Sequence, residues 1–182
     1  MKITNTPFEG LLILESIEFH DERGYFTEAY NEQTLRKNGI VSHFVQDNQS
    51  YSRKNVMRGL HFQNIPYEQT KLVRVLSGTI LDVVVDLRKQ QPTFGKSMSI
   101  ELSAANKKQF YIPKGFAHGF VVISDSAEVL YKADEHYNKE AEGGLYFNDP
   151  ALGIDWGISQ NEAIISSKDL TLPLLRDLTT GF

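Results

Sequence analysis

The 182-residue sequence has no cysteine, a single tryptophan and no long apolar segment. Without cysteine the protein forms no disulfide, no thiolate zinc site and no cysteine nucleophile. Its longest apolar stretch, near residues 115–124, is about half the length that a membrane-spanning helix needs. The first residues also lack the apolar stretch of a signal peptide. We therefore expect a cytoplasmic protein that has no membrane partner.

The sequence also lacks any block of one charge. Its 19 Lys and Arg residues against 23 Asp and Glu residues give a net charge of −4. A mildly acidic chain is a poor candidate for nonspecific nucleic-acid binding, although it can still hold a local basic pocket. No repeat or low-complexity tract divides the chain, and 41% of its residues are hydrophobic. We expect one globular domain over residues 1–182.

Short segments of β-strand composition recur about every ten residues, a spacing typical of sandwiches and barrels. They cover residues 11–14, 25–30, 44–51, 56–63, 70–76, 79–87, 96–102, 108–112, 119–123 and 128–132. One early helix is expected, capped by Asn31 and ended by Asn38 and Gly39. From about residue 157 we expect a short helical or irregular cap. This pattern predicts an all-β fold, a cupin-like jelly roll (double-stranded β-helix), which encloses a pocket between two sheets.

The segment 56–63 is the strongest candidate for chemistry, because Arg58 and His61 lie there among apolar residues. Strict strand alternation places these two side chains on opposite faces. Gly59 lies between them and suits a β-bulge, which would turn both toward the same side. A lone strand histidine is more often structural, but Lys71 in a neighbouring predicted strand favours a functional site.

Lys71 shares a strand face with Val73 and Val75. Burying a lysine on such a face is costly unless it meets an anion or a developing negative charge. The alternative is that Lys71 lies at the strand end and extends its ammonium group to water.

Two further residues have both a functional and an ordinary interpretation. A turn at Pro113 and Gly115 places His118 at the start of a strand, where it is either functional or solvent-facing. Tyr131 continues a later strand, as either a functional hydroxyl or a core aromatic residue. The stretch 82–86 has an acidic residue at each end and alternating apolar residues, so we expect a half-exposed strand without function.

Several short motifs run along the chain: RGYFTE at 23–28, QDN at 46–48, RGLHFQ at 58–63, IPKGFAHGF at 112–120, YK at 131–132, GIDW at 153–156 and SSKD at 166–169. Together with Lys71 and Tyr137, they resemble the dTDP-4-dehydrorhamnose 3,5-epimerase family in order and spacing. Gly157 departs from the pattern, since the family usually has proline there.

The resemblance implies a homodimer that acts on a dTDP-sugar without a metal or other cofactor. His61 looks like the general base, and Asp169 looks like the residue that orients it. Tyr131 looks like the general acid, and Lys71 looks like the contact of the 4-keto oxygen. The residues that look like further substrate contacts are Gln46, Asn48, Arg58, His118, Tyr137 (stacked on thymine), Glu142 and Lys168, with Arg23, Phe26 and Glu28 contributed by the partner subunit.

These residue types suit the inversion of a carbon next to a carbonyl group. In a 4-keto sugar, inversion at C3 or C5 needs proton removal from one face and proton delivery to the other. A neutral histidine accepts a proton near pH 7, whereas tyrosine holds its proton there. A lysine stabilises the oxygen of the enolate as its charge develops. The carbonyl of the substrate is the electron sink, so the reaction requires no metal.

Three alternatives remain open at the level of sequence. A metal-dependent cupin is disfavoured, because its usual His-x-His pair is replaced by His61-Phe62-Gln63. A non-catalytic sugar-binding module would not need His61, Lys71 and Tyr131 together. An epimerase that inverts only C3 or only C5 has the same motifs.

Overall fold

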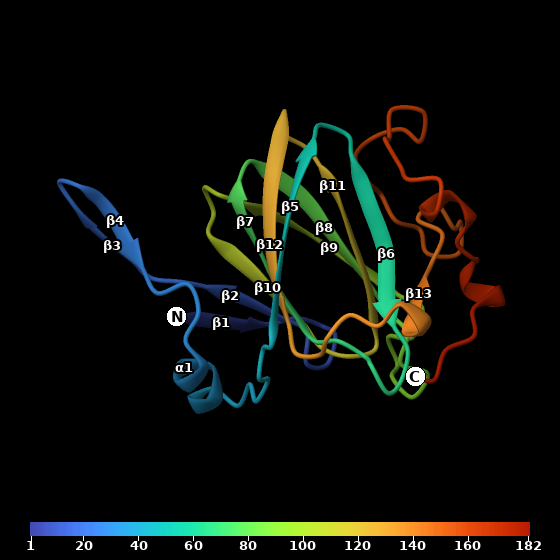
Figure 1. Ribbon diagram of the computed structural model, residues 1–182, viewed down its shortest axis with the longest axis horizontal. Coiled ribbons are helices and arrows are strands. Elements are labelled where there is room, and N and C mark those ends of the chain that lie inside the picture. The colour runs from blue at the N-terminus through green and yellow to red at the C-terminus, as the bar shows by residue number, and fades with distance from the viewer.

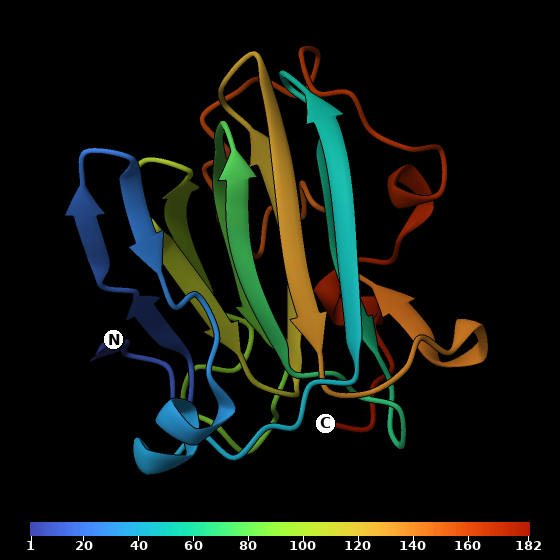
Figure 2. The same cartoon turned by 60° about the vertical axis from the view of Figure 1, so that its left-hand side comes forward.

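The computed structural model describes residues 1–182 and consists mainly of two antiparallel β-sheets that face each other (Figures 1 and 2). In spatial order, the six-stranded sheet comprises β1 (Lys2–Asn5), β2 (Leu12–Glu15), β10 (Lys108–Ile112), β7 (Lys71–Ser77), β12 (Ser126–Ala133) and β5 (Gln46–Arg53). The five-stranded sheet comprises β13 (Glu142–Gly144), β6 (Met57–Gln63), β11 (Phe116–Val122), β8 (Thr79–Asp86) and β9 (Ser97–Ser103). The predicted all-β, cupin-like jelly roll is confirmed.

The main hydrophobic core lies between the two sheets. Val73 and Val75 of β7 and Val129 of β12 pack there against Val84 of β8 and Phe120 of β11. Strand alternation directs every second residue inward, so polar residues at inward positions must lie beside this core or in a cavity next to it. The strands that carry Lys71, Tyr131 and His118 therefore bring those residues into the space between the sheets.

A second core covers the outer face of the five-stranded sheet. The chain beyond β13 wraps across this face (red in Figure 1) and buries Val83 and Val85 of β8 against residues such as Leu152 and Trp156. It includes two 3-10 helices, η2 (Asp169–Thr171) and η3 (Leu175–Asp177), as expected for a short helical or irregular cap.

This covering makes the prediction of a half-exposed strand at 82–86 wrong. Val83 and Val85 of β8 pack in the outer core, whereas Asp82 and Asp86 lie on the inner face, the face of Val84, with no exposed surface. Asp86 pairs with Arg88, whereas Asp82 pairs with His118. Alternation alone does not reveal which face of a strand is covered, and here both faces are.

A third, smaller core covers part of the outer face of the six-stranded sheet. Helix α1 (Glu32–Lys37) packs Leu35 against Leu14 of β2 and Leu72 of β7. Asn31 caps this helix by accepting from the backbone N–H of Thr34, and Asn38 follows its last residue, as predicted. No helix of the protein is both long and apolar enough to cross a membrane.

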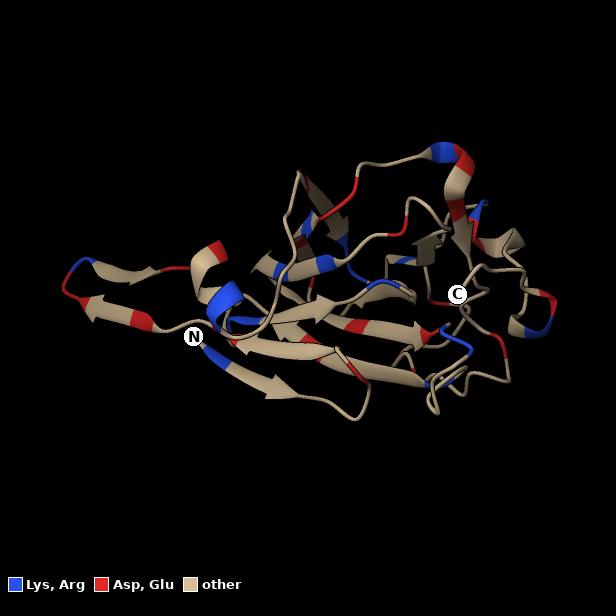
Figure 3. Ribbon diagram, turned by 90° about the horizontal axis from the view of Figure 1, so that it is seen from below, with Lys and Arg blue, Asp and Glu red and all other residues tan.

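A two-stranded hairpin, β3 (Glu18–Asp21) and β4 (Gly24–Thr27), projects from the body of the molecule (Figure 1). Its tip contains charges of both signs (Figure 3), and Arg23 pairs there with Asp21. Phe19 and Phe26 are 61% and 70% exposed. Lys107 of the main body donates to the Tyr25 hydroxyl and lies near Glu18, but the two phenylalanine rings stay largely exposed. Because an isolated hairpin is at best marginally stable in water, a further surface packed on these rings would stabilise it.

Candidate active site

A cavity of about 520 Å³ lies between the two sheets. Residues of β5, β7 and β12 line it from the six-stranded sheet, and residues of β6 and β11 line it from the five-stranded sheet. Its remaining wall comes from the C-terminal segment 164–169. This volume falls in the range of small-molecule binding sites, roughly 300–1,000 Å³.

A bulge in β6 brings Arg58 and His61 into this cavity together. In the pairing of β6 with β11, Arg58 lies opposite Phe120 and His61 lies opposite His118. The segment of β6 between these pairs therefore has one residue more than the segment of β11. Gly59 has a φ of 119°, and a Cβ atom at this position would lie 2.5 Å from the Cα of Gly119. Only glycine tolerates both the positive φ and the close approach of Gly119. The β-bulge predicted from the sequence is confirmed.

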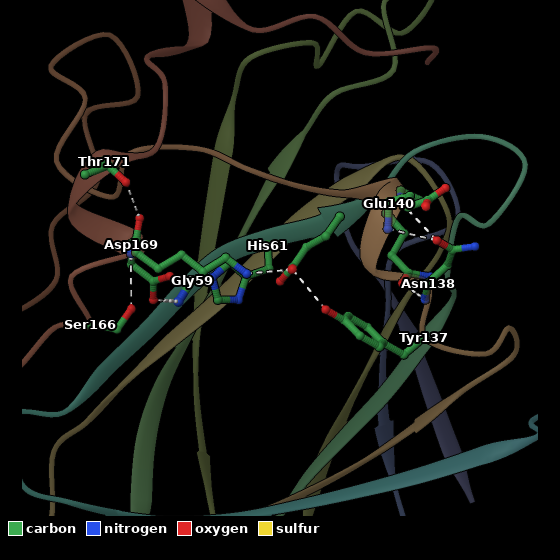
Figure 4. Close-up of polar contacts among 12 residues, drawn as sticks. Gly59, His61, Tyr137, Asn138, Glu140, Ser166, Asp169 and Thr171 are labelled. Carbon is green, nitrogen blue, oxygen red and sulfur yellow. Dashed lines mark hydrogen bonds and ion pairs between the residues drawn. The ribbon is translucent and has the colours of Figure 1, made fainter.

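His61 is paired with Asp169 (Figure 4). Nε2 of His61 lies 2.7 Å from Oδ1 of Asp169, whose other oxygen accepts from the backbone N–H of Gly59 at 3.3 Å. Burial acts to raise the pKa of the Asp169 carboxyl, but the hydrogen bonds from His61 and Gly59 hold that pKa below its usual value. Asp169 is 4% exposed, so an ionised carboxylate is fixed beneath the imidazole ring.

The position of Asp169 is itself set by the end of the chain. The backbone N–H of Asp169 donates to Oγ of Ser166 at 3.1 Å, at the start of η2. Ile164, which lies two residues before Ser166, forms a bridge with Val56, just before β6. These contacts dock the C-terminal segment beside β6, which is how two residues 108 positions apart become partners.

Lys71 and Tyr131 lie in the opposite wall. They come from the neighbouring strands β7 and β12, and the Nζ atom of Lys71 is 5.8 Å from the centre of the Tyr131 ring. Burial lowers the pKa of Lys71 to about 8, against the opposing charges of Asp82 and Glu142. Burial also raises the pKa of Tyr131, with the charge of Arg58 opposing this shift. Lys71 thus faces the cavity, where it is partly buried.

His118 and Asp82 form a second histidine–aspartate pair, which sequence reasoning missed. Nε2 of His118 lies 2.9 Å from both carboxylate oxygens of Asp82, and the two residues are 7% and 0% exposed. Burial raises the pKa of Asp82, while His118 and the charge of Lys71 oppose the shift. His118 is therefore not solvent-facing. No group of three His, Cys, Asp or Glu side chains in the protein is arranged to hold a metal ion.

Three predicted substrate contacts form one cluster, of which Lys168 lines the cavity. Oε2 of Glu142 lies 2.6 Å from Nζ of Lys168 and accepts from the Tyr137 hydroxyl at 3.0 Å. Gln46 joins this cluster, because its Oε1 accepts from the backbone N–H of Tyr137 and its Nε2 donates to Asn48. The Tyr137 ring is 56% exposed, so a flat ligand has room to stack on it.

The structure does not bring the remaining predicted contacts to this cavity. Arg23 and Phe26 lie on the projecting hairpin, and Glu28 follows it and accepts from Asn31. None of the three lines the cavity of its own chain. The hairpin extends away from the body of the molecule (Figure 1).

Comparison with known proteins places this geometry in a family. The model of the dTDP-4-dehydrorhamnose 3,5-epimerase family matches residues 5–177. The chain belongs to this family of epimerases. It is 51% identical to the dTDP-4-dehydrorhamnose 3,5-epimerase of Salmonella typhimurium over 176 residues, which covers 96% of each chain.

Solved structures of the epimerase family agree in fold over nearly the whole chain. The dTDP-4-dehydrorhamnose 3,5-epimerase of Elizabethkingia anophelis superposes with a TM-score of 0.93 at 51% identity, covering 97% of both chains. A dTDP-6-deoxy-D-glucose-3,5-epimerase of Legionella pneumophila also gives a TM-score of 0.93, at 44% identity, covering 98% of this chain and 94% of the other. The Legionella structure contains dTDP-4-keto-L-rhamnose.

Proposed function

We propose that this epimerase converts dTDP-4-dehydro-6-deoxy-D-glucose into dTDP-4-dehydro-L-rhamnose by inverting C3 and C5. The observation that carries the proposal is the placement of two proton-transfer groups on opposite walls of one cavity. His61 belongs to the five-stranded sheet, and Tyr131 belongs to the six-stranded sheet. A planar intermediate bound between them is exposed to a base on one face and to an acid on the other, as inversion requires.

The base in this scheme is His61. Asp169 accepts from Nε2–H, which leaves the lone pair of Nδ1 to remove a proton from the carbon next to the carbonyl. The ionised Asp169 then stabilises the imidazolium that forms. The same carboxylate is held by the backbone N–H of Gly59, so the ring keeps one orientation through the cycle.

Tyr131 is the acid, and its surroundings favour that role. Burial raises the pKa of its hydroxyl, so the group remains protonated at neutral pH until a carbanion-like carbon takes the proton. Lys71 lies beside it and stabilises the negative charge that develops on the 4-keto oxygen. Because this charge is larger in the transition state than in the bound ketone, the lysine lowers the barrier by an amount on the order of 3 kcal/mol.

The nucleotide is proposed to lie across the edge of the cavity. The Tyr137 ring stacks on thymine, and Lys168 and Arg58 attract the diphosphate. Gln46, Asn48, His118 and Glu142 complete the contacts within one chain. Lys168 is bound to Glu142 in this structure, so a diphosphate would compete with Glu142 for the same ammonium group.

The active unit is proposed to be a homodimer. Arg23, Phe26 and Glu28 do not line the cavity of their own chain, and Phe26 is 70% exposed. Insertion of the hairpin against a second subunit would cover its aromatic rings and complete the partner's nucleotide site. A cytoplasmic location remains a prediction from the sequence.

The proposal is tested by NMR spectroscopy of dTDP-4-dehydro-6-deoxy-D-glucose incubated with the protein in D₂O. Inversion at both centres predicts deuterium at C3 and C5 and a product of the L-rhamno configuration. Deuterium and inversion at a single carbon would instead identify a mono-epimerase. No exchange at either carbon, together with intact binding of dTDP, would indicate a protein that binds sugar nucleotides without catalysing epimerisation.

A further inference from the structure

The hydroxyl of Ser50 is the unusual group in the wall of the cavity. Its Oγ atom is buried and has no hydrogen-bond partner in the protein. Most buried side-chain hydroxyls are hydrogen-bonded, because an unpaired one forfeits the bonds that it makes in water. The residue nevertheless lines the cavity, so a bound ligand is within reach of its side chain.

Ser50 lies on the inward face of β5, in the middle of a row of polar side chains. Strand alternation places it between Asn48 and Ser52 on the same face, and it pairs across the sheet with Val129 of β12. β5 is an edge strand of the six-stranded sheet. A polar row on an inward face next to a core is unexpected for packing and typical of a binding surface.

The adjacent cation is Arg58. Its Nε donates to Oγ of Ser52 at 3.0 Å, and this bond links β6 in one sheet to β5 in the other. Ser52 is 4% exposed, so the guanidinium is anchored at one edge. No carboxylate lies within ion-pair distance of Arg58, and its two terminal nitrogens donate to no protein group. An unpaired guanidinium with its fork free is suited to a phosphate group.

We propose that the Ser50 hydroxyl donates a hydrogen bond to a phosphate oxygen of the nucleotide diphosphate that Arg58 binds. A rotation about χ1 turns Oγ from its buried position toward the cavity, between staggered positions that serine readily adopts. The phosphate then satisfies the hydroxyl and the free nitrogens of Arg58 at once. Ser52 is the positioning residue for Arg58, and Ser50 is the contact to the ligand. The inference rests on the nucleotide-sugar function proposed above.

The test is the affinity for dTDP, measured by calorimetry, for the wild-type protein and for Ser50→Ala. Loss of a hydrogen bond to a charged group predicts about tenfold weaker binding. Ser50→Thr keeps the hydroxyl and is expected to retain most of the affinity. Ser99→Ala is the matched control, because Ser99 is an exposed strand serine in the other sheet. Thermal melting of each variant verifies that it is folded.

Kinetics then separate phosphate binding from chemistry. The proposal predicts that Ser50→Ala raises KM in step with the dissociation constant of dTDP and leaves kcat unchanged. Unchanged dTDP affinity in folded Ser50→Ala would overturn the proposal. If kcat fell at the same time, the hydroxyl would instead contact the sugar of the substrate. Failure of the wild-type protein to bind dTDP at all would instead refute the proposed function.

Discussion

Nε2 of His61 and Oδ1 of Asp169 lie 2.7 Å apart, although the residues are separated by 108 positions in the chain. The contact joins strand β6 to the 3-10 helix η2, which lies near the C-terminus of the chain. In the proposed mechanism, docking of the C-terminal segment therefore orients the imidazole ring of His61, in addition to completing the outer core.

Asp169→Asn is therefore expected to lower kcat by about 10²- to 10⁴-fold, since the amide no longer fixes the ring or stabilises the imidazolium. The dissociation constant of dTDP is expected to change little. Steady-state kinetics and calorimetry measure the two quantities. The matched control is Asp177→Asn, which alters an exposed carboxylate on η3. Equal activity of the two variants would exclude the orienting role of Asp169.

Lys71→Met is expected to abolish most of the activity and to stabilise the fold. The pKa of Lys71 falls from 10.5 to about 8 in the folded protein, so the ammonium group destabilises it at neutral pH. Methionine removes that penalty, with a gain in the free energy of unfolding of roughly 1–3 kcal/mol. The gain should be full below pH 8 and shrink as the pH rises toward 10.5. Denaturant titrations of the wild-type protein and Lys71→Met at pH 7 and pH 9.5 measure this gain at the two pH values. A variant less stable than the wild type at pH 7 would contradict the prediction.

The same pKa predicts an alkaline limit to catalysis. Lys71 stabilises the enolate oxygen only while it carries its proton, which it loses as the pH rises through about 8. Burial raises the pKa of Tyr131 above its ordinary value near 10, so Tyr131 does not account for a loss of activity at pH 8. Because this pKa belongs to the ligand-free protein, we expect kcat/KM to decline above pH 8 in a profile measured from pH 6 to 10. A kcat/KM that stays level to pH 10 would contradict a requirement for protonated Lys71.

Sequence patterns predicted most of this fold, because the longer strands are rich in β-branched and aromatic residues and are bounded by turn residues. The strand at 108–112 was predicted with its observed bounds, and the capping of α1 by Asn31 was also predicted correctly. Strands β1, β3 and β13 were missed, since each is short and has at most one large apolar residue. Strand β11 begins at Phe116, three residues before the predicted start, because the turn at Gly115 is followed at once by paired residues.

The site was less predictable than the fold. Gly59 signalled the bulge locally, so the approach of Arg58 to His61 could be inferred from neighbouring residues. The pairing of Asp82 with His118 could not, because it depends on the C-terminal segment covering the other face of β8. An acidic residue in a strand looks solvent-facing until the opposite face is known to be buried.

The hairpin gives a prediction about assembly. The wild-type protein is expected to be a dimer by light scattering, and Phe26→Asp should weaken both the dimer and the binding of dTDP, because it adds a charge to the surface that packs on the partner. Phe94→Asp changes an exposed aromatic residue on a loop of the main body and is the control. A wild-type protein that is monomeric and fully active at low concentration would contradict the proposal that the partner subunit completes the nucleotide site.

The central claim is that His61 and Tyr131 act on opposite faces of one intermediate, and Tyr131→Phe tests it most directly. In D₂O, deuterium incorporation and epimerised product are measured on the same sample by NMR spectroscopy. His61 can still remove a proton and return one to the same face, so exchange should continue while inversion is lost. Equal loss of exchange and inversion would contradict the donor role, and loss of neither would make Tyr131 an ordinary core residue.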